Sequence, residues 1–240
     1  MNAFFGCVQL EKNDSLLDKQ KNYMNSVFAS FPSRFPIKQV IENYNVLLSG
    51  DFESTTSEND VQSNTPTLFF NGEIYNKQEI KNILGVYYAK NNASLVSELI
   101  LRKGLKSVQL INGKFFIIYI DRPQQKVYLL NDQMGIRQCY YYQGKNVLLF
   151  GSEIKFLLVH PDCPKEIDWE TSLKRPSSSA GLSAFKSYKT WVKDISLFPE
   201  ASKMCVDIEK KEIKTITYWN HLERTHYDYS NDNRTPRSEE

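Results

Sequence analysis

The chain has 240 residues, of which 41% are hydrophobic and 24% are charged, and its formal net charge is +2. This is the composition of an ordinary soluble globular protein with one large domain or two small ones. Because the basic residues are dispersed, no stretch has the concentrated positive charge of a nucleic-acid-binding surface. The start has no signal-peptide pattern and the longest apolar run, Phe115–Ile120, is too short to span a bilayer, so we expect a cytoplasmic protein without membrane contacts.

Short apolar runs separated by polar segments dominate the first third of the chain. We predict strands at Phe4–Leu10, Val46–Leu48 and Thr67–Phe70, because these runs are rich in aromatic and β-branched residues. Leu16–Phe28 instead has apolar residues at helical spacing. Gly50–Pro66 is rich in Ser, Thr, Asn and Asp, which predicts a surface loop.

The middle of the chain predicts two helices followed by the densest strand signals. The helices are expected from about Lys77 and over Ser94–Lys103. The strands are expected at Lys114–Asp121, Lys126–Leu130, Gln138–Tyr142 and Val147–Phe150, the last two joined by a hairpin turn at 143–146.

The last third predicts a short helix at Ser152–Leu158, a Ser-rich loop at Lys174–Ser183, and a closing hairpin made of Lys203–Asp207 and Glu212–Tyr218. From His221 onward the chain is polar and is expected to be a linker or frayed end. We therefore place a domain at 1–220 and a tail at 221–240. Many strands with few helices predict an α+β domain with a mainly antiparallel sheet.

The cysteines and histidines give no metal signal. The four cysteines are far apart and form no CxxC pair, and the three histidines complete no ligand spacing, so we expect no metal site. Scattered thiols without a signal peptide indicate a reducing cytoplasm, where they are expected to be buried apolar side chains. They are Cys7, Cys139, Cys163 and Cys205.

Four segments occur in the order and spacing of a known set of motifs. They are Phe70–Asn76 (FNGEIYN), Leu110–Asp121 (LINGKFFIIYID), Asn131–Tyr141 (NDQMGIRQCYY) and Phe150–Leu158 (FGSEIKFLL). Together they resemble the N-terminal class II glutamine amidotransferase domains of asparagine synthetases, over roughly residues 1 to 220. The alternative is a generic β-rich domain with ordinary hairpins.

The resemblance implies an N-terminal-nucleophile hydrolase fold, a four-layer αββα sandwich with two antiparallel sheets. In that family residue 2 is a cysteine, which becomes the N-terminal residue once Met1 is removed. Its thiolate attacks the side-chain amide of glutamine, and its free α-amino group acts as the base. The released ammonia passes to a second domain that uses ATP. Here Asn2 stands at the cysteine position, and a carboxamide cannot act as this nucleophile. The nearest thiol, Cys7, lies inside the first predicted strand and is expected to be structural.

The positions implied for the rest of the site are only partly kept. Asn71 and Gly72 match the side-chain and backbone donors of the oxyanion hole, although an Asn-Gly pair is also good turn chemistry, and we favour that structural interpretation. Asn92 stands where the family has an aspartate that binds the α-amino group of glutamine. Arg34 is a loosely aligned substitute for the arginine that binds the α-carboxylate. Glu73 is kept, as a site residue or as a solvated turn residue.

These departures predict that the glutaminase activity is lost and that the remaining positions are vestigial. The chain holds no SGGxDS-type pyrophosphate loop, so ATP and Mg²⁺ are expected only in a C-terminal or separate asparagine-synthetase-type domain. The start Met1–Gly6 is similar to that of the lasso-peptide cyclases, asparagine-synthetase homologues that need no ammonia. Our leading hypothesis is therefore a non-catalytic domain of a cyclase-like, amide-forming ligase, and a homodimer is compatible with the sequence.

Two alternatives remain open. One is the glutaminase domain of an asparagine synthetase with weak residual activity. The other is a free-standing interaction module that docks a partner ligase.

Overall fold

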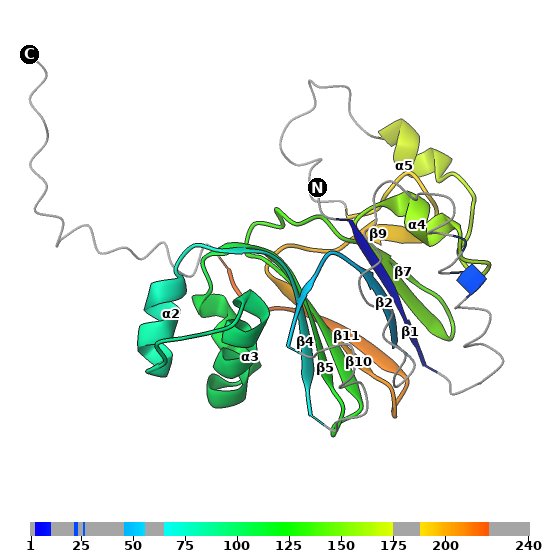
Figure 1. Cartoon of the computed structure of the whole chain (residues 1–240). Helices are drawn as coiled ribbons and strands as arrows, with labels where there is room; N and C mark the ends of the chain where they lie inside the picture. Colours follow the sequence, from blue (N-terminus) through cyan, green and yellow to red (C-terminus); the bar gives the residue numbers. More distant parts are fainter. Residues whose placement is uncertain are drawn as a thin grey trace, which may run out of the picture.

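The computed structural model describes residues 3–10, 22, 23, 26, 46–55, 65–174 and 188–220, and these residues form two stacked β-sheets with helices on both outer sides (Figure 1). The five-stranded sheet A has the order β2-β1-β8-β7-β9, and the six-stranded sheet B has the order β11-β10-β6-β5-β4-β3. All strand pairs within the described residues are antiparallel. The strands of sheet A are β1 (Phe4–Gln9), β2 (Val46–Gly50), β7 (Tyr140–Gln143), β8 (Val147–Gly151) and β9 (Ile195–Leu197). Those of sheet B are β3 (Glu53–Ser54), β4 (Thr67–Ile74), β5 (Gly113–Asp121), β6 (Lys126–Asn131), β10 (Ser202–Asp207) and β11 (Glu212–Thr217).

Burial on both faces explains why the central strands are continuous apolar runs rather than alternating ones. In β5, Phe116 and Ile118 point into the core between the sheets, whereas Phe115 and Ile117 point to the opposite face of sheet B. The same alternation divides β1, where Phe4 faces sheet B and Phe5 faces the outer side of sheet A. Three apolar layers therefore result from one period-two pattern.

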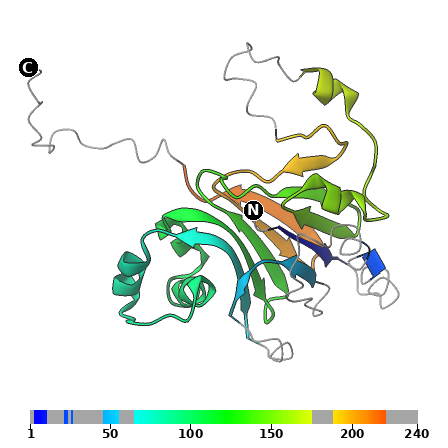
Figure 2. The ribbon, with the colours of Figure 1, turned by 45° about the horizontal axis from the view of Figure 1, so that its top comes forward.

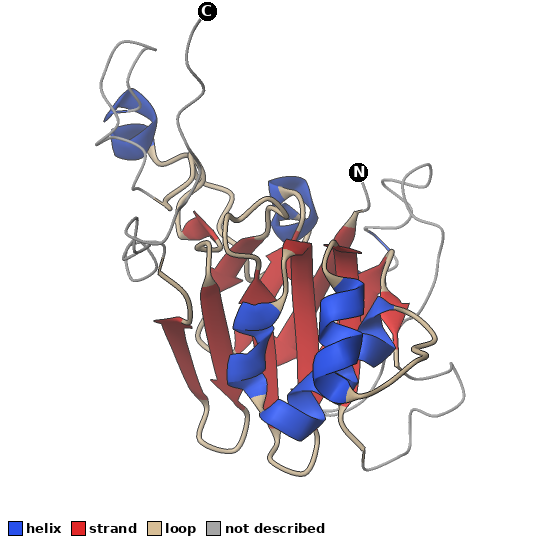
Figure 3. Ribbon diagram, turned by 90° about the vertical axis from the view of Figure 1, so that its left-hand side faces the viewer, coloured by secondary structure: helices blue, strands red, loops and turns tan. Residues whose placement is uncertain are grey.

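Helices form the two outer layers of the sandwich. α2 (Lys77–Leu84), α3 (Asn92–Lys103) and the 3-10 helix η1 (Leu105–Leu110) cover the outer face of sheet B, while α4 (Ile154–Leu158) packs on sheet A (Figures 1 and 3). Figure 2 shows α2 and α3 on one side of the stacked sheets and α4 and α5 (Trp169–Lys174) on the other. The expected αββα sandwich is confirmed.

Several predicted boundaries need correction. The predicted loop 50–66 is wrong at Glu53–Ser54, which pair with Phe69 and Phe70 as the edge strand β3. The strand predicted to end at Phe70 continues to Ile74, because β5 offers backbone partners along its whole length. The elements β9, α5 and η1 were not predicted. Most of the predicted helix 16–28 and of the loop 174–183, and the tail 221–240, lie outside the described residues.

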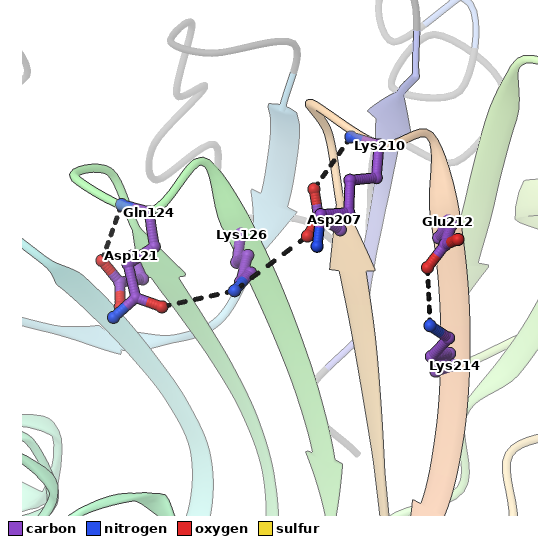
Figure 4. Close-up of polar contacts among 7 residues, drawn as sticks. All are labelled: Asp121, Gln124, Lys126, Asp207, Lys210, Glu212 and Lys214. Carbon is purple, nitrogen blue, oxygen red and sulfur yellow. Dashed lines mark hydrogen bonds and ion pairs between the residues drawn. The ribbon is translucent and has the colours of Figure 1, made fainter.

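Two hairpins of sheet B close with the same side-chain contact (Figure 4). In the β5–β6 turn, Asp121 Oδ1 accepts a hydrogen bond from the backbone N–H of Gln124 at 3.2 Å. In the β10–β11 turn, Asp207 Oδ1 accepts from Lys210 N–H at 2.9 Å. Each carboxylate satisfies a turn amide that the ladder cannot pair, so the predicted hairpin at 208–211 is confirmed with its local cause.

A buried histidine, His160, follows the C-terminal end of α4. His160 is 4% exposed, and its ring meets that of Tyr23 edge-on at 4.7 Å between centroids. Its Nδ1 accepts a hydrogen bond from Asp162 N–H at 3.2 Å, which requires an unprotonated nitrogen. Burial lowers the pKa of His160 below its ordinary value, against an opposing effect of the Asp162 charge.

This depressed pKa predicts acid-dependent stability. The unfolded chain takes up a proton at His160 before the folded protein does, so the unfolding free energy falls as the pH drops below about 6.5 and is unaffected by this group above pH 7. We expect His160→Asn, which keeps an acceptor for Asp162, to flatten urea-denaturation stability between pH 7 and 5.5. His221 and His226 are present in both proteins, so their contribution cancels. An unchanged slope in the variant would refute the assignment.

Candidate functional site

Asn71, Gly72 and Glu73 are consecutive residues of β4, so the interpretation of Asn71–Gly72 as a turn is wrong. Asn71 pairs with Phe116 and Gly72 with Phe115 across the β4–β5 ladder. Because strand side chains alternate, Asn71 shares the face of Phe69, which packs in the core between the sheets. The Asn71 side chain is 1% exposed and therefore sits inside the sandwich.

The amide of Asn71 is engaged by the protein itself. Its Nδ2 donates a hydrogen bond to the backbone oxygen of Asp51 at 2.6 Å. Its Oδ1 is buried and has no hydrogen-bond partner among the residues that the structure describes. This contact uses one of the two N–H donors of the Asn71 side chain.

Gly72 has a steric reason to be glycine. Its φ is +143°, a backbone conformation that residues other than glycine rarely adopt. A Cβ placed there would lie 2.0 Å from the backbone oxygen of Lys114. The neighbouring Glu73 points outward, where its carboxylate meets Lys114 Nζ at 3.1 Å. This exposed ion pair contributes little to stability.

Asn92 begins helix α3 and lies against an acidic side chain. Its backbone N–H and side-chain Nδ2 both donate to the carboxylate of Glu53, at 2.5 and 3.0 Å, and Ala93 N–H donates to the same carboxylate at 3.3 Å. Asn91 caps the helix by accepting from Ser94 N–H at 2.8 Å. The start of α3 thus has its free amides satisfied by Glu53 and Asn91.

The structure links the two asparagines through one short segment rather than through direct contact. Asp51 binds Asn71 on the inner face of sheet B, and Glu53 binds Asn92 on the helix side. Within the described residues no hydrogen bond joins the Asn71 and Asn92 side chains. The sequence does not reveal Asp51 and Glu53 as neighbours of these asparagines, because both fall in the predicted surface loop Gly50–Pro66 and no local pattern in that stretch marks them.

The N-terminal end of β1 lies at the same place. The backbone oxygen of Ala3 accepts from Asp51 N–H at 3.2 Å, so the chain just before β1 is next to the residue that holds Asn71. Asn2 and Arg34 themselves lie outside the described residues, and the roles inferred for them remain predictions from the sequence.

Cys7 is confirmed as a structural thiol. It is fully buried in β1, and burial raises its pKa to about 12, which disfavours the thiolate that a nucleophile needs. Cys139 and Cys163 are also buried, whereas Cys205 is only half-buried, and all four are free thiols. Among the described residues, no group of three or more His, Cys, Asp or Glu side chains could hold a metal ion, and no helix is long and apolar enough to cross a membrane.

Comparison with known proteins identifies the fold and its lineage. Residues 56–219 match the family model of the glutamine amidotransferase domain. The chain belongs to the class II glutamine amidotransferase domain family. This amidotransferase domain is 32% identical over 152 residues to glutamine-hydrolyzing asparagine synthetase 2 of Bacillus subtilis, covering 62% of this chain and 20% of that protein. It is 28% identical over 137 residues to asparagine synthetase 3 of the same organism, covering 53% of this chain and 22% of that protein.

A solved structure supports the fold independently. The structure titled as the allosteric regulatory enzyme of purine biosynthesis superposes with a TM-score of 0.54 at 11% identity, over 90% of this chain and 49% of that one. The amidotransferase domain therefore has the N-terminal-nucleophile hydrolase fold expected from its sequence. It spans about a fifth of the length of the two Bacillus relatives that it matches.

The geometry at Gly72 predicts a severe effect of the smallest side chain. In Gly72→Ala, the added methyl group would collide with the Lys114 carbonyl and the backbone would keep an unfavourable φ, so we expect a loss of at least about 3 kcal/mol of unfolding free energy. The measurement is urea denaturation followed by circular dichroism. Gly85→Ala is the matched control, since Gly85 also has positive φ but has open space around its Cβ position. Equal losses in the two variants would show that the Lys114 contact is not the cause.

Proposed function

We propose that this amidotransferase domain is catalytically silent and serves as the non-catalytic N-terminal domain of an asparagine-synthetase-like, amide-forming ligase. The observation that carries the proposal is that one segment, Asp51–Glu53, already binds the side chains of both Asn71 and Asn92. The sequence adds the replacement of the nucleophile by Asn2. Together these features remove the nucleophile and commit one side-chain N–H donor each of Asn71 and Asn92 to the domain's own chain.

The chemistry of glutamine hydrolysis explains why these losses combine. The reaction needs a thiolate, donors for the tetrahedral oxyanion, and charged groups that hold the amino-acid end of glutamine. Asn2 supplies no thiolate, and Asn71 donates to the Asp51 carbonyl. Asn92 is neutral and directs its donor at Glu53, so it offers no negative charge to an α-ammonium group.

The lengths of the relatives support an accompanying domain. Both Bacillus asparagine synthetases extend far beyond the part that this chain matches. We place ATP and Mg²⁺ in such a domain or subunit, in the cytoplasm, where a substrate carboxylate would be activated for attack by an amine. A lasso-peptide cyclase-like ligase fits best, because a peptide's own amino terminus replaces ammonia and a silent glutaminase would not limit it.

Glutamine hydrolysis discriminates this proposal from a weakly active asparagine synthetase, the alternative favoured by the 32% identity to the Bacillus protein. We expect purified protein to release no glutamate above the level of an Asn71→Ala control in a coupled glutamate dehydrogenase assay. We also expect Asn2→Cys alone to stay inactive, since the contacts of Asp51 and Glu53 remain. Hydrolysis by the unmodified protein would refute the silent domain, and hydrolysis by Asn2→Cys would show that the binding groups are still competent.

The surface for the ATP-using domain is proposed at the loop 132–137. Asp132 is fully buried, and its carboxylate accepts backbone hydrogen bonds from Phe115, Met134, Ile136 and Arg137 at 3.0–3.1 Å, which fixes the loop. Met134 and Ile136 nevertheless remain 71% and 56% exposed. A rigid loop that presents two aliphatic side chains to solvent is typical of an interface.

The path of the chain after β11 indicates which domain would contact the loop 132–137. Tyr218, just after β11, donates its hydroxyl to the backbone oxygen of Asn131 at 2.5 Å, next to Asp132, and its N–H bonds to Ala201 O at 2.8 Å. Burial, and secondarily the Asp132 charge, raises the pKa of Tyr218, so the hydroxyl keeps its proton. The polypeptide beyond β11 therefore starts beside the loop 132–137, where a following domain would meet Met134 and Ile136.

This placement predicts a local effect on association. With this domain and the ATP-using domain produced as separate chains, Met134→Glu and Ile136→Glu together are expected to weaken their affinity at least about tenfold, or about 1.4 kcal/mol, because charges would be buried at the contact. Isothermal titration calorimetry measures this affinity. Tyr87→Glu, at a 99% exposed residue between α2 and α3, is the control and should leave the affinity unchanged. Equal affinities for all the proteins would place the interface elsewhere.

A further inference from the structure

The guanidinium of Arg137, the last residue of the loop 132–137, has no acceptor among the residues that the structure describes. Its side chain is partly buried, and its Nε is fully buried without a hydrogen-bond partner in that part of the chain. The two other described arginines are paired: Arg102 Nε binds the Glu98 carboxylate at 2.5 Å, and Arg122 donates to a backbone oxygen at 3.2 Å. Buried polar groups in folded proteins are nearly always hydrogen-bonded, so an open guanidinium indicates a missing partner.

The acidic residues beside this loop are already engaged by other groups. Each carboxylate oxygen of Asp132 accepts two backbone N–H groups, one of them from Arg137 itself, so the lone pairs of Asp132 are in use. Glu200, whose side chain lies against Gly135, accepts the hydroxyl of Tyr188 at 2.8 Å. Within the described ranges no ion pair joins either acid to Arg137. The loop therefore fixes the backbone of Arg137 and supplies its charge with no counter-ion.

The chemistry of this loop specifies what a partner must offer. A guanidinium is a planar group of five donors and no acceptor, and it matches the two oxygens of a carboxylate in a bidentate pair. Met134 and Ile136 lie one and three residues before Arg137 and are largely exposed. A protein surface that covers them also removes water from the neighbouring guanidinium, which is costly unless that surface supplies an acceptor. The complementary surface is therefore an apolar patch with a carboxylate beside it.

We infer that Arg137 binds a carboxylate of the ATP-using domain, beside the aliphatic contact made by Met134 and Ile136. The inference rests on the proposed function for the identity of the partner, because the chain leaves β11 next to this loop. The open guanidinium itself rests only on the contacts of this domain. The aliphatic side chains contribute contact area without direction, whereas a bidentate ion pair fixes the orientation of the partner. Arg137 is thus the specificity-determining residue of the interface.

Substitution of Arg137 tests the contact between the two domains, produced as separate chains. Arg137→Met keeps an unbranched side chain and removes the charge, so we expect the affinity measured by isothermal titration calorimetry to fall at least about tenfold and to depend less on salt. Arg137→Lys restores the charge without the planar fork, and it should give an intermediate affinity that still depends on salt. The matched control is Arg102→Met, at the α3 arginine that is paired with Glu98, which should leave the affinity unchanged.

A second measurement needs this chain alone. In ¹⁵N-labelled protein, the Nε–H resonances of Arg137 and Arg102 are identified by their loss in Arg137→Lys and Arg102→Met. Sodium acetate is expected to shift the Arg137 resonance saturably, because the guanidinium is open to a carboxylate, whereas sodium chloride at equal ionic strength is not. The Arg102 resonance should respond to neither salt, since Glu98 already occupies that Nε–H.

The results separate this inference from the proposed function. If Arg137→Met binds the partner domain as tightly as the unmodified protein while Met134→Glu with Ile136→Glu binds more weakly, the interface stands and the role of Arg137 is refuted. An Arg137 resonance that ignores acetate, or responds equally to chloride, would also overturn that role. None of these measurements involves glutamine hydrolysis, so a hydrolytically active protein with an acetate-responsive Arg137 would refute only the silent domain.

Discussion

The stacking of two sheets whose central strands are buried on both faces constrains the rest of this domain. Because β1 and β8 in sheet A and β5 and β6 in sheet B have apolar side chains on both sides, these central strands offer no open surface for chemistry. Polar groups can also collect where the chain passes from one sheet to the other. The connection from β2 in sheet A to β3 in sheet B is such a passage, and it consists of Asp51 and Phe52. Phe52 joins the inner core, which leaves the polar groups of Asp51 and Glu53 to face Asn71 and Asn92.

Asn71 and Gly72 show that the residues of a motif can also be required by the fold. Gly72 must remain glycine because the Lys114 carbonyl occupies the space of a side chain. The Asn71 side chain donates a hydrogen bond to the Asp51 carbonyl and thereby holds the connection between β2 and β3 in place. Both residues thus have structural duties that hold whether or not glutamine is bound. The survival of a sequence motif in this family is consequently weak support for activity when the nucleophile is absent.

The sequence was most informative where a single strand carries its own signal. The runs that became β1, β5, β6 and β8 could be predicted because burial on both faces leaves an unbroken apolar pattern. Glu53 and Ser54 could not, since two polar residues form a strand only because β4 extends beside them. The Asn71–Gly72 pair was misassigned for the same reason: its local preference for a turn is overridden by pairing with Phe115 and Phe116. The contact of Glu53 with Asn92 joins residues 39 positions apart, and no local window contains it.

The covalent connection of Glu53 to the residues at the start of α3 has a quantitative consequence for any carboxylate in solution. A tethered group acts at an effective concentration that is on the order of millimolar even for a flexible linker and rises as the linker stiffens. Glu53 is held by β-pairing on one side and by the crossing between the sheets on the other, so its linker is stiff. A competing carboxylate from solution must also give up its translational freedom, which Glu53 surrendered when the chain folded. The carboxylate that caps α3 is therefore a fixed part of the fold, and carboxylates in solution compete with it poorly.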